Sequence, residues 1–253
     1  TQNTALGRSA LAANSTADSN VAVGYLALAA NTTNGSSTAV GTSALAAQTS
    51  GSLNTAVGAA ALTTLTGGAN NVAMGFAAMQ LSTNADNNVA IGYAAMNANT
   101  TGSSCTAVGG GALDANTTAD SNTAIGYNSL TTNTTGAQNT AIGRNALDAN
   151  TTAGNNTAVG YEALTANTTG TPNVAVGAHS MQTNTTGTHN TGLGYFALSA
   201  NTTANSNTAV GASALQNNST GADNTSVGYI AGHGHTTGSR NTCVGGNAGS
   251  GIT

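Results

Sequence analysis

The chain has 253 residues, of which only 4% are charged and 3% are aromatic, and its formal net charge is −4. Because an average soluble domain carries about 25% charged residues, the acids, bases and metal ligands that most enzymes use are scarce. Three Lys and Arg residues in total are too few for a nucleic-acid-binding surface, and no apolar run approaches the ~20 residues of a membrane span. We therefore expect no enzymatic activity, cofactor, metal site, nucleic-acid partner or membrane span.

A glycine recurs at one constant interval along the whole chain, from Gly7 and Gly24 to Gly245, without insertion or deletion. We number each copy from the residue four before this glycine, so the first copy begins at Asn3 and the consensus is N-T-A-V-G-Y-x-A-L-x-A-N-T-T-G-x-x. An unvarying period places every copy in the same environment, and stacking is the simplest way to achieve this. The sequence therefore predicts a single repeat domain over residues 1–253. The alternative is that this domain is a piece of a longer fibre.

The first predicted element of each copy is a short strand. Position 2 is Thr or Val, position 3 is nearly always Ala, and position 4 is Val, Ile, Leu or Met, which is the alternation typical of a strand. The glycine at position 5 suits a sharp bend. Positions 8 and 9, usually Ala-Leu, are predicted to start a second short strand, and the N-T-T-G stretch is typical of a turn.

Seventeen residues are too few for a pair of helices, and the A-L-x-A segments are too short for one stable helix. The predicted fold is therefore an all-β β-solenoid of 15 coils, roughly 70 Å long at ~4.8 Å per coil.

Large apolar side chains occupy two positions of each copy, and we expect them to form two buried ladders. Position 4 carries Leu6, Val23, Val40, Val57, Met74, Ile91, Val108, Ile125, Ile142, Val159, Val176, Leu193, Val210, Val227 and Val244. Position 9 carries Leu11, Leu28, Leu45, Leu62, Met79, Met96, Leu113, Leu130, Leu147, Leu164, Met181, Leu198 and Leu215. Two such groups per coil do not offset the backbone entropy of the whole coil. The sequence thus predicts an oligomer whose Ala-rich faces, at positions 3 and 8, lie near another subunit.

Asparagine recurs at two further positions. At position 1 it occurs in thirteen of fifteen copies, with Ser37 and Cys105 as the exceptions, and this predicts a stacked asparagine ladder. At position 12 it is followed by Thr-Thr or Ser-Thr, which forms an N-glycosylation acceptor in a predicted surface turn. Turn chemistry alone is the alternative explanation. These candidate acceptors are Asn14, Asn31, Asn99, Asn116, Asn133, Asn150, Asn167, Asn184, Asn201 and Asn218.

All six tyrosines fall at position 6: Tyr25, Tyr93, Tyr127, Tyr161, Tyr195 and Tyr229. From Tyr93 onward they occur in every second copy, mostly with small residues between them. We favour packing of each ring over its neighbouring coil. The functional alternative is an exposed aromatic stripe that grips sugars or another fibre.

The remaining candidate residues have structural explanations. Cys105 and Cys243 lie about eight coils apart, too far for a disulfide. A zinc site needs three or four ligands, and the sequence offers no third ligand beside His233 and His235. We therefore expect both to be surface histidines. Threonine or serine fills position 13 in every copy. A turn ladder explains this more simply than ice binding, which needs two outward threonine rows on one flat face.

The repeat N-T-A-[VIL]-G-Y-x-A-L-x-x-N-T-T-G-x-x resembles the 17-residue repeat of tail-fibre proteins from phages and large algal viruses. Its N-T-A-V-G core is also similar to the shorter repeat in the head of YadA-type trimeric autotransporter adhesins. The resemblance covers the whole chain. It implies a left-handed parallel β-roll, three chains per fibre, and a location outside the cell on a virion or cell surface.

These observations predict a structural rod or fibre shaft that spaces a binding tip, with itself as the main partner and a cell-surface glycan or receptor as a further one. A self-assembling extracellular filament and an ice- or glycan-binding solenoid are the alternatives. Gly232 and Gly249 replace the position-9 leucine in the last two copies, so we expect a weakened, uncapped core there. Uncapped coils predict end-to-end continuation along the fibre axis.

Overall fold

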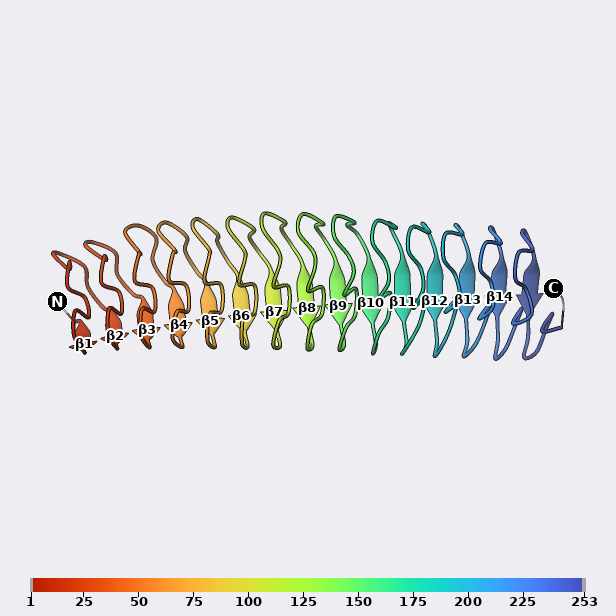
Figure 1. The fold of residues 1–253 in the computed structure, drawn as a ribbon, viewed down its shortest axis with the longest axis horizontal. Helices are drawn as coiled ribbons and strands as arrows, with labels where there is room; N and C mark the ends of the chain where they lie inside the picture. The colour runs from red at the N-terminus through yellow and green to blue at the C-terminus, as the bar shows by residue number, and fades with distance from the viewer. Residues whose placement is uncertain (1, 252–253) are drawn as a thin grey trace. The chain divides into compact units, whose positions relative to one another are not determined.

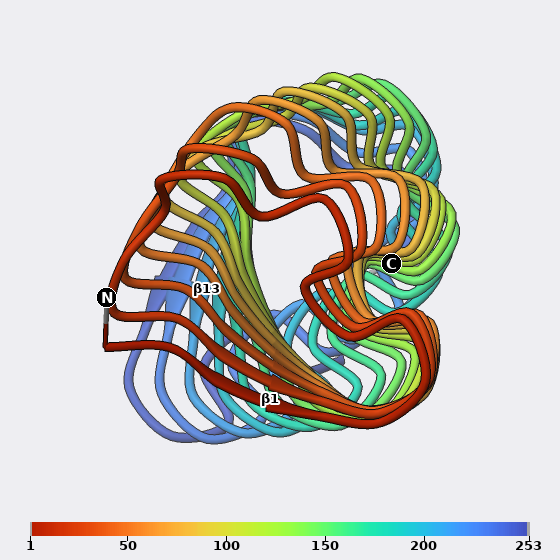
Figure 2. The same ribbon diagram turned by 90° about the vertical axis from the view of Figure 1, so that its left-hand side faces the viewer.

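The computed structural model describes residues 2–251 and confirms the predicted fold class. Each copy of the repeat forms one coil with one strand of three residues, and the described residues contain no helix. Figure 1 shows these strands in chain order, and end-on each coil is a loop with its strand along one side (Figure 2). The protein is therefore a parallel β-solenoid.

The chain divides into two compact units, Thr1–Asn122 (unit 1) and Thr123–Thr253 (unit 2). The strands of unit 1 are β1 (Thr4–Leu6), β2 (Val21–Val23), β3 (Thr38–Val40), β4 (Thr55–Val57), β5 (Val72–Met74), β6 (Val89–Ile91) and β7 (Thr106–Val108). Those of unit 2 are β8 (Thr123–Ile125), β9 (Thr140–Ile142), β10 (Thr157–Val159), β11 (Val174–Val176), β12 (Thr191–Leu193), β13 (Thr208–Val210), β14 (Thr225–Val227) and β15 (Thr242–Val244).

Within each unit, successive strands pair in parallel at a register of one repeat. Ala158 in β10, for example, pairs with Ala175 in β11 and with Ala141 in β9. Equivalent residues of neighbouring coils therefore stack directly on one another, which is the arrangement that the unvarying period predicts.

The strand turns its middle residue inward and both outer residues outward. The position-3 residue, usually alanine, is buried in every strand after β1, whereas position 4 is half-buried or exposed. The predicted core ladder at position 4 is therefore wrong. Because side chains alternate between the two faces of a strand, burying position 3 sends positions 2 and 4 to the surface together.

The predicted ladder at position 9 is confirmed as the core, but the predicted second strand is wrong. The position-9 residues from Leu28 to Leu215 are fully buried. They lie in a turn with positive φ, 50° for Leu28 and 51° for Leu164. A non-glycine residue in this left-handed region costs roughly 1–2 kcal/mol, and burial of a leucine side chain returns about 1.5–3 kcal/mol. The left-handed conformation points each leucine side chain into the coil. In a strand, successive side chains would instead alternate between the inside and the outside.

The recurring glycine at position 5 is required by close approach between coils. Gly160 has a φ of +140°, and a Cβ at this position would lie 2.5 Å from the carbonyl oxygen of Gly177 in the next coil. Only glycine tolerates both the backbone conformation and this contact. This explains why the repeat period is clearest in the sequence at this glycine.

The asparagine ladder at position 1 is confirmed, with a main-chain donor at each step. The backbone N–H of Asn156 donates to Oδ1 of Asn139 in the preceding coil at 3.0 Å. The Nδ2 of Asn156 donates to the carbonyl oxygen of Gly170, also at 3.0 Å. Each buried amide thus provides a hydrogen-bond partner for one backbone N–H and one backbone carbonyl. If either group were left unpaired, the folded state would lose about 1–3 kcal/mol of stability.

A second asparagine ladder lies at position 12, and here the predicted surface location is wrong. The Nδ2 of Asn167 donates to Oδ1 of Asn150 at 3.2 Å and to the carbonyl oxygen of Gly170 at 3.1 Å. Nine of the ten candidate acceptors are fully buried, and Asn14 is half-buried. The asparagine side chains point inward because the turn carbonyl and the amide of the neighbouring coil are buried polar groups that need hydrogen-bond partners. The asparagine amides supply these partners in place of water. A glycan on these buried nitrogens would break both hydrogen bonds.

The last two coils fill their interior differently. A Cβ on Gly232 would lie 2.5 Å from Oγ of Ser226, and one on Gly249 would lie 2.5 Å from Sγ of Cys243. Larger residues at position 3 thus occupy space that the position-9 leucine takes elsewhere. The weakened core expected at these glycines stays a prediction.

Candidate functional surfaces

The outer face of the strands carries a regular row of apolar side chains in each unit. Position 4 presents a valine, isoleucine, leucine or methionine from each coil, with threonine or valine at position 2 beside it. Ile142, Val176 and Val227 each expose more than a third of their surface. Contiguous exposed apolar patches are typical of interaction sites, so the strand face is a candidate interaction surface.

The six tyrosines at position 6 are all exposed, by between 41% for Tyr161 and 68% for Tyr93. Tyr25, Tyr127 and Tyr161 also lie near guanidinium groups, with the Cζ of Arg144 5.9 Å from the ring centroids of both Tyr127 and Tyr161. Packing of each ring over the neighbouring coil therefore covers only part of its surface, and the rings stay accessible to a partner.

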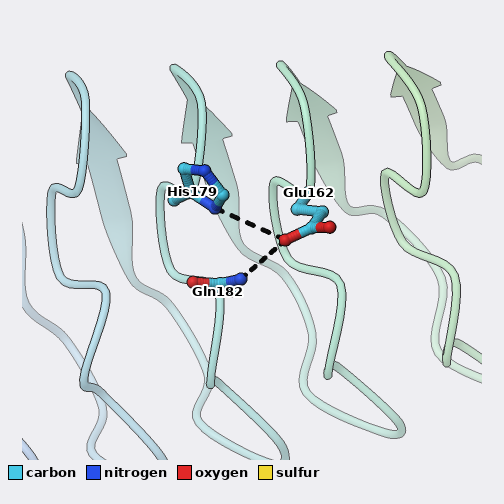
Figure 3. A network of polar contacts seen from close by, with 3 residues as sticks. All are labelled: Glu162, His179 and Gln182. Carbon is cyan, nitrogen blue, oxygen red and sulfur yellow. Dashed lines mark hydrogen bonds and ion pairs between the residues drawn. The ribbon is translucent and has the colours of Figure 1, made fainter.

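One polar network joins neighbouring coils of unit 2 (Figure 3). Oε2 of Glu162 accepts a hydrogen bond from Nε2 of Gln182 at 2.8 Å and lies 3.5 Å from Nδ1 of His179. The Glu162 carboxylate also raises the pKa of the Tyr161 phenol, chiefly because deprotonation would lose their hydrogen bond. The sequence analysis missed this network. Its signal was the separation of Glu162 from His179 by one full repeat, which stacks equivalent positions.

The histidines lie in different environments. His189 is exposed, and His233 is half-buried. His235 is buried at position 12, in line with the second asparagine ladder, and its Nε2 lies 4.0 Å from Sγ of Cys243. The prediction that His235 is a surface histidine is therefore wrong. Among residues 2–251, no three histidine, cysteine or acidic side chains gather as metal ligands would.

Both cysteines are free thiols. Burial raises the pKa of Cys105 to about 11, since a desolvated thiolate is unfavourable. A nucleophilic cysteine needs a lowered pKa, so Cys105 is a packing residue at position 1 of its coil.

The threonine row at position 13 is used for hydrogen bonding between coils. Oγ1 of Thr168 donates to the carbonyl oxygen of Thr185, and Oγ1 of Thr185 donates to that of Thr202, both at 3.1 Å. These hydroxyl protons face the neighbouring coil, so the turn-ladder interpretation accounts for them.

The described part of the chain contains no pocket, and no helix in it could cross a membrane. Its candidate functional features are therefore surfaces: the aliphatic strand face, the tyrosine row and the network around Glu162. Together they define a β-solenoid repeat protein with an accessible, uncharged strand face. No family model, no curated protein and no solved structure matches this chain.

Proposed function

We propose that the protein is a structural shaft, built from several copies of this chain that associate through the strand face of positions 2 and 4. The observation that carries the proposal is the row of half-buried and exposed aliphatic side chains at position 4. In line with the family resemblance, we propose three chains per shaft and a location outside the cell, on a virion or cell surface.

Three features support self-association. The strand face carries no charged residue at position 2 or 4, so its burial leaves no ion desolvated. It repeats at one strand spacing, ~4.8 Å, and a second copy of the chain offers the same spacing along its whole length. Each buried valine or isoleucine adds about 1.5–3 kcal/mol, and the contribution recurs in every coil.

Light scattering of the purified chain tests this proposal. We expect a mass about three times the chain mass of 24.1 kDa for the wild type. The double substitution Ile142→Lys and Val176→Lys adds two charges to the strand face while leaving the interior intact, and we expect folded monomers. Thr152→Lys with Thr186→Lys, on exposed turns of the same two coils, is the matched control and should assemble normally.

A wild type that stays monomeric at all accessible concentrations would disprove the proposed association. Substitution of Ala158 is unsuitable as a test, because this residue is buried inside its own coil and a charge there would unfold the chain. Electron microscopy separates the two kinds of assembly: discrete particles with a bulky end support a shaft, and long uniform filaments support a filament protein.

A further inference from the structure

A cluster of aromatic rings lies on three consecutive coils of unit 2, where the network of Figure 3 is located. We call Tyr161, His179, Tyr195 and Phe196 the aromatic platform. The His179 ring stacks on Phe196 with centroids 4.8 Å apart, and Tyr195 meets Phe196 edge to face at 4.3 Å. Tyr161 and Tyr195 lie on either side of His179, at 5.2 Å and 6.1 Å. Such contacts hold the rings in fixed positions.

The platform is accessible to a ligand. Tyr161 is 41% and Tyr195 54% exposed. Ala178 occupies position 6 of the coil between them, so no third large side chain stands in the tyrosine row at this point. Rigid tyrosine side chains offer apolar contact area and a phenol hydroxyl at low entropic cost.

Polar groups border the platform. The two contacts drawn in Figure 3 both use Oε2 of Glu162, and the Tyr161 phenol also hydrogen-bonds to this carboxylate. Gln182 adds an amide and Arg144 a guanidinium near the Tyr161 ring. Apolar ring surface bordered by a carboxylate, an amide and a cation matches the chemistry of a sugar, which has an apolar ring face and a rim of hydroxyl groups.

The spacing of the two exposed rings selects the kind of sugar chain. Two coils separate Tyr161 from Tyr195, which corresponds to about 10 Å at the normal spacing between strands. Alternate rings of an extended β-1,4-linked glycan present the same face at closely this interval. We infer that the aromatic platform binds a linear β-1,4-linked glycan, with Tyr161 and Tyr195 under the first and third of three consecutive sugars. This inference is independent of the proposed shaft function.

Titration of the full chain with oligosaccharides of increasing length tests this inference, using the cello- and chito-oligosaccharide series. We expect disaccharides to bind weakly and affinity to rise by about tenfold at the trisaccharide, when the second ring becomes engaged. Maltohexaose is the ligand control, since its α-1,4 linkages curve the chain and remove the regular spacing, and we expect no binding.

Variants locate the site. Tyr161→Ala with Tyr195→Ala should weaken binding of the hexasaccharides by about tenfold or more, and Glu162→Gln should weaken it less, because the rings remain. Tyr25→Ala removes a similarly exposed tyrosine of unit 1 and should leave affinity unchanged. Circular dichroism of each variant is the control that checks whether its fold is retained.

Three results would overturn the inference. They are absence of wild-type binding to both β-1,4-linked series, unchanged affinity in the double tyrosine variant, and an equal loss in Tyr25→Ala. If neither series binds while unit 2 of the double variant becomes less stable, the rings serve only to hold neighbouring coils together.

Discussion

Unit 2 carries asparagine at position 12 in six consecutive coils, from Asn133 to Asn218, whereas unit 1 has Gln48, Leu65 and Ser82 in three consecutive coils. In unit 2 each of these amides from Asn150 onward donates to the amide of the preceding coil, at 2.8–3.4 Å. In unit 1 the equivalent bond joins Asn116 to Asn99. The same coil is thus held together by a continuous polar ladder in one unit and by a partly apolar interior in the other.

Unit 1 shows how such exceptions are accommodated. The third coil has Ser37, which is shorter than asparagine, at position 1 and Gln48, which is longer, at position 12. Nε2 of Gln48 reaches Oγ of Ser37 at 3.2 Å and the carbonyl oxygen of Gly51 at 2.8 Å. Both residues are fully buried. The comparison shows that a longer residue at position 12 can reach a shorter one at position 1 and keep the two ladders connected, although Oε1 of Gln48 is buried without a hydrogen-bond partner among the described residues.

Interruption of the continuous ladder should have the largest effect. Asn167→Ala removes hydrogen bonds to Asn150, Asn184 and Gly170, so we expect a loss of about 2–4 kcal/mol in the local stability of unit 2. Asn31→Ala in unit 1 removes only bonds to Asn34 within its own coil and should cost about 1 kcal/mol. Amide hydrogen exchange measures both values. Equal losses would mean that the ladder adds nothing beyond its individual coils.

The paired exception in unit 1 should be strongly non-additive. Ser37→Asn places a larger side chain against Gln48, and Gln48→Asn is too short to keep the hydrogen bond to Ser37. Each single variant should therefore lose about 1–2 kcal/mol of stability. The double variant restores the consensus at both positions and should lose markedly less than the sum. Chemical denaturation of the four proteins of this cycle gives the coupling energy. Additive losses would show that the two residues do not compensate each other.

Alkaline pH should weaken unit 1 through Cys105. The pKa of this thiol is raised to about 11, so folding favours the neutral form. Its contribution is complete below the ordinary thiol pKa of about 8.5 and is lost as the pH rises through 11. We expect unit 1 to lose about 1–2 kcal/mol between pH 8 and pH 10 relative to a Cys105→Ala variant. Hydrogen exchange that shows the same pH dependence in wild type and variant would contradict this.

The smallest expected effect concerns two aspartates at position 10. Desolvation raises the pKa of both Asp114 in unit 1 and Asp148 in unit 2, and a backbone hydrogen bond from Asn97 partly opposes the shift only at Asp114. Oδ1 of Asp148 is buried without a hydrogen-bond partner. At neutral pH, Asp148→Asn should therefore raise the melting temperature slightly more than Asp114→Asn does. The reverse order would show that the backbone hydrogen bond is not the deciding difference.

The candidate surfaces could be predicted only in part. The tyrosine row was visible in the sequence because every ring falls at position 6, and position 4 was recognised as a continuous aliphatic row. Its exposure was not, because the alternation of a strand is equally consistent with either face lying inside. The network of Glu162, His179 and Gln182 was missed, because its members belong to two successive copies of the repeat and meet only after stacking.

The sequence by itself determined the period, the β-solenoid class, the short strand of each coil and the ladder at position 1, because an exact repeat stacks like on like. Tertiary structure decided which side chains point inward. Leucines and methionines in left-handed turns fill every coil but the last two from one side, which leaves room only for the small residue at position 3 on the other side. The position-12 asparagines point inside because turn carbonyls accept their hydrogen bonds. The direction of each side chain depends on the space inside the coil and on the hydrogen-bond partners across it. Both are set by residues six to nine positions apart in the sequence and by residues of neighbouring coils.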